Sequence, residues 1–449
     1  MLYDNNNAMI RRKIYSGVAQ LAMEDRLEGG LEELAEGLVP GISKILRGKD
    51  LSAARRLVKY RLSSALGIGF NNEASYYEMA KEANAEGGPA GPLIATLDGA
   101  CSHAGSDAHP CEAACISDAL TVKNDKVYID KEKCIRCGFC VAACPTGAIT
   151  DKADIVRTVK MLKDGSAPVY AVLAPAFAGQ FGTKEGKVKC GLLHLGFRDV
   201  FEVALGADVI TVREAEEFIK RMERGDRFMI TSCCCPPFFA LVEKYKPEMA
   251  YLISDSVSPM IGIGRMLKTK HPGCRVVFIG PCIAKKREAK KPELKDAVDV
   301  VLTFEEMAGF LKNLNYDMSN MHKDDMCDAS HDGRAYAHTG GVTAAIISSI
   351  RRLNPDIKVN VIRANGIKEC REVLNKAAVN KLDANFVEGM ACIGGCVGGP
   401  GRILDPEAGK RYVDAFASEA YIKEAVSNKK AREFVKKFGH KIILHSQKN

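Results

Sequence analysis

The stretch ITSCCCPPFF, residues 230–239, places three cysteines in succession after a β-rich run and directly before two prolines. Two more cysteine groups, GPCIA at 280–284 and MACIGGC at 390–396, also follow β-rich runs. Open α/β sheets place ligand sites beyond the carboxyl ends of their strands. Three separate strand ends are therefore expected to converge on one metal site.

The sequence around these groups alternates between short β-rich runs and helical patterns from about residue 165 onward. This alternation predicts an α/β fold with largely parallel sheets covered by helices. The β-rich runs lie at 168–175, 207–212, 227–232, 274–280, 298–304, 358–364 and 384–389.

The first part of the chain has a different texture. Apolar residues recur at three- and four-residue spacing over 10–23, 30–38 and 52–69, which predicts helices. The run EGGPAGP at 86–92 is a Gly/Pro break and a candidate linker. We expect a helical region at 1–92, a cysteine-rich module at 93–155 and a large α/β domain at 160–449.

Composition excludes some function classes. Lys+Arg 64 against Asp+Glu 56 gives a net charge of +8 over 449 residues, a mild excess that does not itself indicate nucleic acid binding. The basic segments 284–295 and 429–441 are either solvated helix faces or a docking surface for an acidic partner. No run approaches ~18 consecutive apolar residues, and no targeting segment is recognisable, so we expect a cytoplasmic protein without a membrane span.

Seventeen cysteines in tight clusters argue against a disulfide framework and for metal ligation. CIRCGFCVAACPTGAI follows the pattern C-x2-C-x2-C-x3-C-P, in which three thiolates bind one iron–sulfur cube and the fourth reaches a neighbouring cube. A structural zinc site is the alternative, which this spacing fits poorly. The cysteines of this motif are Cys134, Cys137, Cys140 and Cys144.

The preceding segment is less regular and contains Cys101, Cys111 and Cys115. CEAACISDAL mirrors CVAACPTGAI, so by symmetry Cys115 completes the first cube, and Cys144 joins Cys101 and Cys111 in a second cube that lacks one ligand. Three outcomes stay open for that cube: a histidine ligand, a labile iron with three cysteines, or no second cluster. The candidate histidines are His103 and His109.

The segments ITSCCCPPF, FIGPCIAKKRE and GMACIGGCVGGPG together resemble the three active-site segments of iron–iron (FeFe) hydrogenases, whose usual forms are TSCCP, PCxAKKxE and MACPGGCxxGGG. The resemblance covers about residues 95–449. The triple cysteine, and the glycine before the second motif, are similar to the branch called group B. The resemblance implies a catalytic domain of two largely parallel-sheet α/β lobes around the H-cluster, with an α+β ferredoxin-like module.

The resemblance also implies roles for individual residues. The H-cluster joins a 4Fe-4S cube to a di-iron carbonyl–cyanide subsite, and Cys396 would also bridge to that subsite. Cys234 would be the last proton donor, Lys285 would hydrogen-bond a cyanide, and Cys233 would pack or tune Cys234. The implied cube ligands are Cys235, Cys282, Cys392 and Cys396. The implied cofactor-lining residues are Ala174, Pro175, Ser258 and Met390.

A proton route follows from the same register. Counting back from Cys235 places Glu214, Glu217 and Arg221 on the family's relay positions, and counting forward places Ser254 on the relay serine. Positions 214, 217 and 221 share one face of a helix, where ionisable groups can pass protons inward. An ordinary solvated acidic face is the alternative interpretation.

Some positions depart from the family pattern. Gly280 stands where many members have Met, Phe238 where Trp is usual, and Ile393 where Pro is usual, while Pro400 and Arg402 interrupt the glycine tail. These residues are expected to shift the potential of the cluster or the access of oxygen more than cluster binding.

The sequence thus predicts reversible reduction of protons to H2. One or two additional 4Fe-4S clusters would relay electrons to or from ferredoxin or a similar low-potential carrier, and maturation proteins would build the di-iron unit. A hydrogenase-related H2 sensor, or a non-enzymatic iron–sulfur carrier or assembly protein, is the alternative. A pure carrier needs neither a proton-donating thiol at Cys234 nor a cyanide partner at Lys285. Sensors typically carry signalling domains, and none is recognisable in this sequence.

Overall fold

The structure of the chain is a computed structural model. It describes residues 6–46, 50–85, 93–101, 109–124, 126–231, 234–313 and 326–443. The predicted linker at 86–92, Cys233 and His103 lie outside these described residues.

The chain forms two compact units. The larger unit holds residues 167–301 and 318–449, and the smaller unit holds residues 2–166 and 302–317. The domain boundaries expected from the sequence, at 92 and near 155–160, stay predictions.

The larger unit is built on two sheets. One has the strand order β6-β5-β8-β9, and the other has the order β10-β11-β7. The pairs β5–β6, β5–β8, β10–β11 and β11–β7 are all parallel, which confirms the prediction of largely parallel sheets. The strands are β5 (Val169–Leu173), β6 (Asp199–Glu202), β7 (Met229–Ile230), β8 (Arg275–Gly280), β9 (Val300–Thr303), β10 (Val361–Asn365) and β11 (Phe386–Met390).

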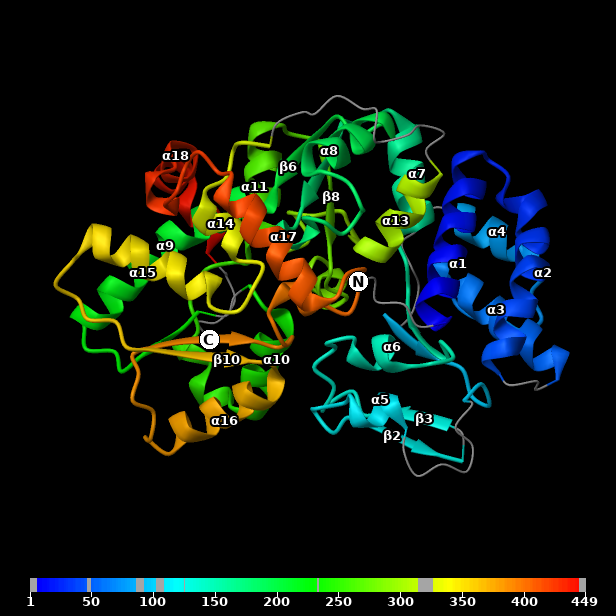
Figure 1. Cartoon of the computed structure of the whole chain (residues 1–449), viewed down its shortest axis with the longest axis horizontal. Coiled ribbons are helices and arrows are strands. Elements are labelled where there is room, and N and C mark those ends of the chain that lie inside the picture. Colours follow the sequence, from blue (N-terminus) through cyan, green and yellow to red (C-terminus); the bar gives the residue numbers. More distant parts are fainter. Residues whose placement is uncertain are drawn as a thin grey trace. The chain divides into compact units, whose positions relative to one another are not determined.

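Helices surround these sheets (Figure 1). Every residue of β5 and β11 is buried, as expected for parallel strands covered on both faces. The α-helices are α8 (Glu185–His194), α9 (Val203–Glu223), α10 (Pro236–Tyr245), α11 (Pro259–Lys270), α12 (Ala284–Glu288), α14 (His331–Ala335), α15 (Gly341–Leu353), α16 (Ile367–Ala378), α17 (Pro406–Ser418) and α18 (Lys429–Phe438). The 3-10 helices are η1 (Pro175–Phe177), η2 (Pro247–Leu252), η4 (Cys396–Gly398), η5 (Ala425–Ser427) and η6 (Gly439–Ile442).

One predicted strand is wrong. The run ADVITV at 207–212 lies inside α9, and the strand of this region is the preceding β6. All ten residues from Val203 to Val212 are buried, so this part of the helix shows no amphipathic period. A short apolar run of that kind cannot be assigned to helix or strand by periodicity alone.

A hydrophobic core joins α9, α15 and the three-stranded sheet. Phe218 of α9 packs edge-on against Phe386 of β11, with ring centroids 5.4 Å apart. Cys234 and Cys235 pack against this core from the end of β7. The core thus supports one of the three cysteine loops directly.

The smaller unit combines helices with a small iron–sulfur module. The helices expected at 10–23, 30–38 and 52–69 are confirmed as α1, α2 and α3. The helices are α1 (Asn6–Met23), α2 (Leu27–Ile45), α3 (Leu51–Leu66), α4 (Tyr76–Asn84), α5 (Pro110–Ala113), α6 (Phe139–Ala143), α7 (Ile155–Asp164) and α13 (Phe304–Lys312). Two antiparallel pairs complete it: β1 (Ile94–Thr96) with β4 (Ile149–Asp151), and β2 (Leu120–Lys123) with β3 (Lys126–Ile129).

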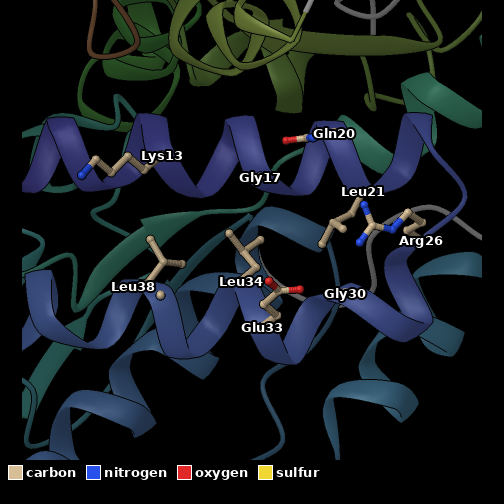
Figure 2. Close-up of a pocket in the computed structure, with 10 residues that line it drawn as sticks. Lys13, Gly17, Gln20, Leu21, Arg26, Gly30, Glu33, Leu34 and Leu38 are labelled. Atoms are coloured by element: carbon tan, nitrogen blue, oxygen red, sulfur yellow. The ribbon is translucent and has the colours of Figure 1, made fainter.

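Glycines allow α1 and α2 to pack closely (Figure 2). A Cβ atom at Gly17 would lie 2.4 Å from Leu34, and a Cβ atom at Gly30 would lie 2.4 Å from Leu21. A groove of about 430 Å³ runs along this contact and also exposes Lys13 and other charged residues. No helix in the described part of the chain has the length and apolarity to cross a bilayer.

Candidate functional site

The three cysteine loops of the larger unit begin at the carboxyl ends of parallel strands. Cys234 and Cys235 follow β7, Cys282 follows β8, and Cys392 and Cys396 follow β11. β7 and β11 are neighbours in one sheet, whereas β8 belongs to the other sheet. The expectation that the cysteine groups follow three strand ends is therefore confirmed.

Direct contacts bring the three loops together. The Ala391 amide donates to Cys235 Sγ at 3.4 Å, which joins the β7 loop to the β11 loop. The Gly401 amide donates to the Pro281 carbonyl at 2.8 Å, which joins the β11 loop to the β8 loop. A Cβ atom at Gly399 would lie 2.6 Å from that same carbonyl, so a side chain there would separate the loops.

The cysteine thiols of these loops interact electrostatically. Burial raises the pKa of Cys396 to about 12, and negative charge at Cys282 and Cys235 adds to the shift. Burial likewise raises the pKa of Cys282 to about 11, while Lys285 acts in the opposite direction. Cys392 is half-buried on the same loop as Cys396. The structure therefore brings Cys235, Cys282 and Cys396 near one another, with Cys392 four residues away along the last loop.

The thiols of these loops fit an iron–sulfur cluster by their chemistry. Among the described residues, no group of three His, Cys, Asp or Glu side chains is placed to hold one metal ion. In a 4Fe-4S cube each thiolate binds a different iron, so the sulfur atoms stand farther apart than around one ion. Soft thiolates are the ligands that such clusters require.

Lys285 supplies a buried positive charge beside the thiols. Its Nζ lies 2.6 Å from Glu288 Oε2, and both side chains are buried. Glu288 thus balances the charge of Lys285, while Nζ still has N–H groups that no other described residue accepts. A buried ammonium with unused donors fits a site for an anionic group.

Cys234 lies between the cysteine loops and an acidic helix. Burial raises the pKa of Cys234 well above its ordinary value, with further contributions from Cys235, Cys396 and Glu214. Glu214 is buried on α9 and accepts a hydrogen bond from Thr231 Oγ1 at 2.5 Å. A carboxylate thus stands near the thiol that the sequence marks as a proton donor.

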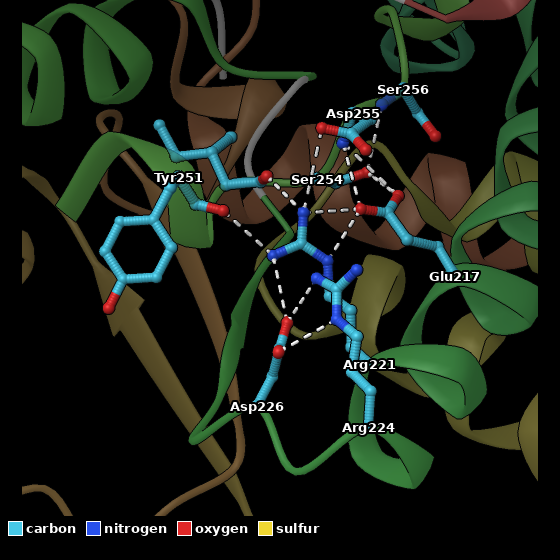
Figure 3. Close-up of polar contacts among 9 residues, drawn as sticks. Glu217, Arg221, Arg224, Asp226, Tyr251, Ser254, Asp255 and Ser256 are labelled. Atoms are coloured by element: carbon cyan, nitrogen blue, oxygen red, sulfur yellow. Dashed lines mark hydrogen bonds and ion pairs between the residues drawn. The ribbon is translucent and has the colours of Figure 1, made fainter. Parts of the chain in front are cut away.

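Farther along α9, a buried network surrounds Glu217 (Figure 3). Glu217 accepts hydrogen bonds from Ser254 Oγ at 2.8 Å and from Arg221 Nε at 2.9 Å. Arg221 also donates to the carbonyls of Tyr251 at 3.0 Å and Ile253 at 2.9 Å. The structure brings three of the four expected relay residues into direct contact, and Glu214 lies one turn before Glu217 on the same helix.

The expected cofactor-lining residues have different surroundings. Ala174 donates its amide to the Ile279 carbonyl at 2.9 Å, at the end of β5 beside the strand that leads to Cys282, and Pro175 begins η1. Met390 is buried at the end of β11, two residues before Cys392. Ser258 caps α11, where its Oγ accepts from the Ile261 amide at 3.5 Å.

The positions that depart from the family pattern are also informative. Ile393 is 74% exposed although it lies between two candidate ligands. Phe238 is fully buried, and a Cβ atom at Gly389 would lie 2.3 Å from its ring. At Gly280, a Cβ atom would lie 2.5 Å from Phe278, so a larger residue there would require this ring to move.

The sequence interpretation missed Glu388, Thr231 and Glu288. Glu388 is buried in β11 and accepts from the Gly340 amide at 2.8 Å and the Thr343 amide at 2.9 Å, next to the amino end of α15. A carboxylate at that end interacts favourably with the helix dipole. A lone Glu within the apolar run NFVEGM was the available signal.

In the smaller unit, the cysteines of the iron–sulfur module form two groups. Burial raises the pKa of Cys137 to about 12, and Cys134 and Cys115 contribute to the shift. Burial also raises the pKa of Cys140, with contributions from Cys137, Cys134 and Cys115 and a further one from Cys111 of the other group. This grouping agrees with the pattern inferred from the internal symmetry.

The second group contains Cys101, Cys111 and Cys144. Burial raises the pKa of Cys111 to about 11, and Cys144 and Cys101 contribute. His109 Nδ1 lies 3.9 Å from Cys101 Sγ, and His109 lines one small cavity together with all three cysteines. The symmetry extends to hydroxyl groups: Cys144 Sγ lies 3.7 Å from Thr146 Oγ1, and Cys115 Sγ lies 3.8 Å from Ser117 Oγ.

Comparison with known proteins agrees with this geometry. The family model described as "Iron only hydrogenase large subunit, C-terminal domain" matches residues 167–400, and the model described as "4Fe-4S binding domain" matches residues 127–150. The apo FeFe-hydrogenase HydA1 from Chlamydomonas reinhardtii aligns with a TM-score of 0.55 and 21% identity, over 65% of this chain and 98% of that chain. This likeness confirms the predicted fold class.

Curated relatives include hydrogenases and assembly factors. The chain is 31% identical to the periplasmic Fe hydrogenase large subunit of Nitratidesulfovibrio vulgaris, over 62% of this chain and 87% of the relative. It is 29% identical to iron hydrogenase 1 of Clostridium pasteurianum, over 62% of this chain and 65% of the relative, so it spans slightly less than two thirds of that protein. It is also 29% identical to the cytosolic Fe-S cluster assembly factor NAR1 of Kluyveromyces lactis, over 28% of this chain and 30% of the relative.

The hydrogenase family model covers more than half of the chain, and it includes all three cysteine loops. The matched 4Fe-4S segment includes the C-x2-C-x2-C-x3-C-P motif. By these matches and by its fold, the chain belongs to the iron-only hydrogenase family.

Proposed function

We propose that this chain is an iron–iron hydrogenase that interconverts H2 with two protons and two electrons. The observation that carries the proposal is the meeting of three cysteine loops beside Cys234 and the buried Lys285. When bound, the H-cluster supplies the irons at which protons and electrons combine. The residues that would hold its cube are Cys235, Cys282, Cys392 and Cys396, and Cys396 would also hold the di-iron subsite.

The protein's own contribution begins with charge and shape. Lys285 compensates the negative charge of a cyanide-bearing subsite, because its ammonium is buried and has donors to offer. The residues proposed to line the subsite are Ala174, Pro175, Ser258 and Met390. The loops pack closely at Pro281 and Gly399, where a side chain at Gly399 would not fit.

Proton delivery uses α9 and the loop after β7. Arg221 fixes Glu217, and Glu217 accepts the hydrogen bond of Ser254. Glu214 stands one helical turn away and interacts with Cys234. We propose that protons pass through Glu217, Ser254 and Glu214 to the Cys234 thiol, which holds the last proton before the reaction site.

Electron delivery uses the smaller unit. We propose one 4Fe-4S cluster on Cys115, Cys134, Cys137 and Cys140, and a second one on Cys101, Cys111, Cys144 and His109. The cavity that His109 shares with three cysteines favours it as the fourth ligand. His109→Ala is expected to leave total iron at that of a single cluster or to give a three-iron signal in electron paramagnetic resonance. An unchanged spectrum would exclude His109.

The proposed electron partner is ferredoxin or a similar low-potential carrier in the cytoplasm. The exposed lysines and arginines of segments 284–295 and 429–441 would attract an acidic carrier, whereas Lys285 and Lys286 are buried. The electron-transfer rate is then expected to fall as ionic strength rises, and a flat dependence would contradict this partner. The triple cysteine supports assignment to the group B branch, and maturation proteins would build the di-iron unit.

Infrared spectroscopy after reconstitution with the synthetic di-iron cofactor tests the function. Carbonyl and cyanide bands together with H2 evolution from reduced viologen are expected. Cys234→Ala should keep the iron content and lower turnover by roughly 10²-fold or more, as for loss of a general acid. Cys274→Ala is the matched control, because Cys274 is buried just before the opposite end of β8. Full turnover in Cys234→Ala would remove the relay assignment.

The similarity to NAR1 favours a second candidate, a non-enzymatic iron–sulfur carrier or assembly protein. A carrier uses the cubes but has no need of a proton-donating thiol or a cyanide partner. Absence of carbonyl and cyanide bands after reconstitution, with intact cubes, would favour this candidate. An H2 sensor would instead bind the di-iron unit and turn over slowly.

A further inference from the structure

The N-terminal helices bury a positive charge against the iron–sulfur module. Arg61 lies on α3 and is only 4% exposed. Its Nη1 donates to the Thr146 carbonyl at 3.5 Å, and its Nη2 donates to the Asn7 carbonyl at 3.3 Å. Both acceptors are neutral backbone groups, so these hydrogen bonds leave the charge of the guanidinium uncompensated.

The surrounding charges do not supply a counter-ion. Burial lowers the pKa of Arg61 to about 10, and Arg11 lowers it further, while Tyr15, Cys144 and Glu305 act in the opposite direction. Glu305 is already paired with Arg11 at 2.5 Å. Within the described residues, no carboxylate forms an ion pair with Arg61. A buried charge without a partner is costly, so some other negative group is expected nearby.

The guanidinium lies against the turn that follows Cys144. A Cβ atom at Gly147 would lie 2.9 Å from Arg61 Cζ, so there is no space for a side chain. Gly147 also has φ +75°, a backbone conformation that favours glycine. Asn7 Nδ2 donates to the Cys144 carbonyl at 2.6 Å. Helices α1 and α3 therefore both donate side-chain hydrogen bonds to the segment that carries Cys144.

We propose that Arg61 is the buried counter-charge of the cluster held by Cys101, Cys111 and Cys144, and that it raises the reduction potential of that cluster. The inference rests on the proposed function of the cysteine-rich module. A cluster with thiolate ligands is an anion and becomes more negative on reduction, so a fixed cation in a poorly screened site stabilises the reduced form. The N-terminal helices then belong functionally to the electron-transfer module.

The test is a redox titration of the iron–sulfur-loaded full chain, monitored by electron paramagnetic resonance. Arg61→Gln removes the charge but keeps a hydrogen-bond donor. The midpoint potential of the cluster on Cys101, Cys111 and Cys144 is expected to become more negative, with a smaller shift for the other cluster. The signal that Cys111→Ser abolishes identifies the cluster in question.

Two controls separate the buried charge from other effects. Arg55→Gln removes a charge from the solvent-exposed face of the same helix, where Arg55 pairs with Glu36, and should leave both potentials unchanged. Arg61→Lys keeps the charge and should stay near the wild-type potential. The shift in Arg61→Gln should persist at high ionic strength, because a buried charge is poorly screened.

The outcomes distinguish the inference from the function on which it rests. If Cys111→Ser removes no signal, the proposed second cluster is absent and the function proposal fails at that point. If the cluster is present and Arg61→Gln leaves its potential unchanged, the inference is wrong. If Arg61→Gln does not load clusters, amide hydrogen exchange of residues 51–66 is measured in the wild-type protein with and without clusters. Removal of the clusters should reduce the protection of α3. Equal protection in the two forms would overturn the inference.

Discussion

Glu217→Gln is the sharpest test of the network around Arg221. The substitution keeps the size of the side chain and removes its negative charge. Glu217 Oε2 accepts from Ser254 Oγ at 2.8 Å, and Oε1 accepts from Arg221 Nε at 2.9 Å and from the Asp255 amide at 3.1 Å. A glutamine has one acceptor oxygen, so its NH2 group must face a donor on one side.

The structure sets the size of the expected effect on stability. Removing one partner of a buried ion pair costs about 3–5 kcal/mol. Arg221 keeps its hydrogen bonds to the carbonyls of Tyr251 and Ile253, and Asp226 stays 4.0 Å away. We therefore expect the free energy of unfolding to fall by about 3 kcal/mol, at the lower end of that range. Loss of a relay carboxylate should also slow turnover at least roughly tenfold, which is ~1.4 kcal/mol in the barrier.

Two measurements on the same preparation separate these effects. Urea denaturation gives the free energy of unfolding, and H2 evolution from reduced viologen gives turnover of the reconstituted chain. Arg224→Gln is the control, since Arg224 lies on the surface and pairs with Asp226 beside the network (Figure 3). Neither quantity should change appreciably in the control. Full turnover in Glu217→Gln across the neutral pH range would refute the relay role, even if stability falls as expected.

Further predictions concern buried charges elsewhere in the larger unit. Burial raises the pKa of Asp208 to about 7. The folded chain therefore keeps a proton that the unfolded chain releases above about pH 4. The free energy of unfolding is thus expected to fall as the pH rises from about 4 to 7. Asp208→Asn should flatten this slope in Tm measured against pH, and an unchanged slope would contradict the assignment. In the wild-type chain, Arg334 donates two hydrogen bonds to Glu202, at 2.7 Å and 2.9 Å. Arg334→Met leaves Glu202 buried without this partner, and should lower the free energy of unfolding in urea by about 3–5 kcal/mol. Lys285→Met should keep the iron of the cube but lose the carbonyl and cyanide bands after reconstitution. The control Lys290→Met changes an exposed lysine and should keep both the iron and the bands. Retention of the bands in Lys285→Met would disprove the role of the ammonium.

Local patterns predicted most of the fold, and the wrong strand prediction at 207–212 has a physical cause. Helix α2 shows a clear period because it has a buried and an exposed face, and α3 shows it only in its first half, since residues 60–66 are all buried. The run at 207–212 is β-branched and apolar because the first half of α9 is buried on all sides. Local propensity was overridden there by tertiary packing.

In the candidate site too, some residues were predicted from the sequence and others were missed. Spacing alone indicated the cysteines of the C-x2-C-x2-C-x3-C-P motif, because ligands must occupy fixed positions on a short loop. The resemblance to FeFe hydrogenases indicated Lys285 and the cysteines of the three loops. Arg61, Thr231 and Glu388 were missed because each gains its importance from a partner distant in sequence. Arg61 meets a carbonyl 85 residues away and Glu388 meets an amide 48 residues away, and no local pattern encodes such pairs.

The origin of the thiolates has one more consequence. Cys282 extends from the four-stranded sheet, whereas Cys235, Cys392 and Cys396 extend from the three-stranded one. A cube held by all four would act as a cross-link between the two halves of the catalytic unit. Metal loss would then abolish electron transfer and also remove this cross-link, which should lower the melting temperature of the unit.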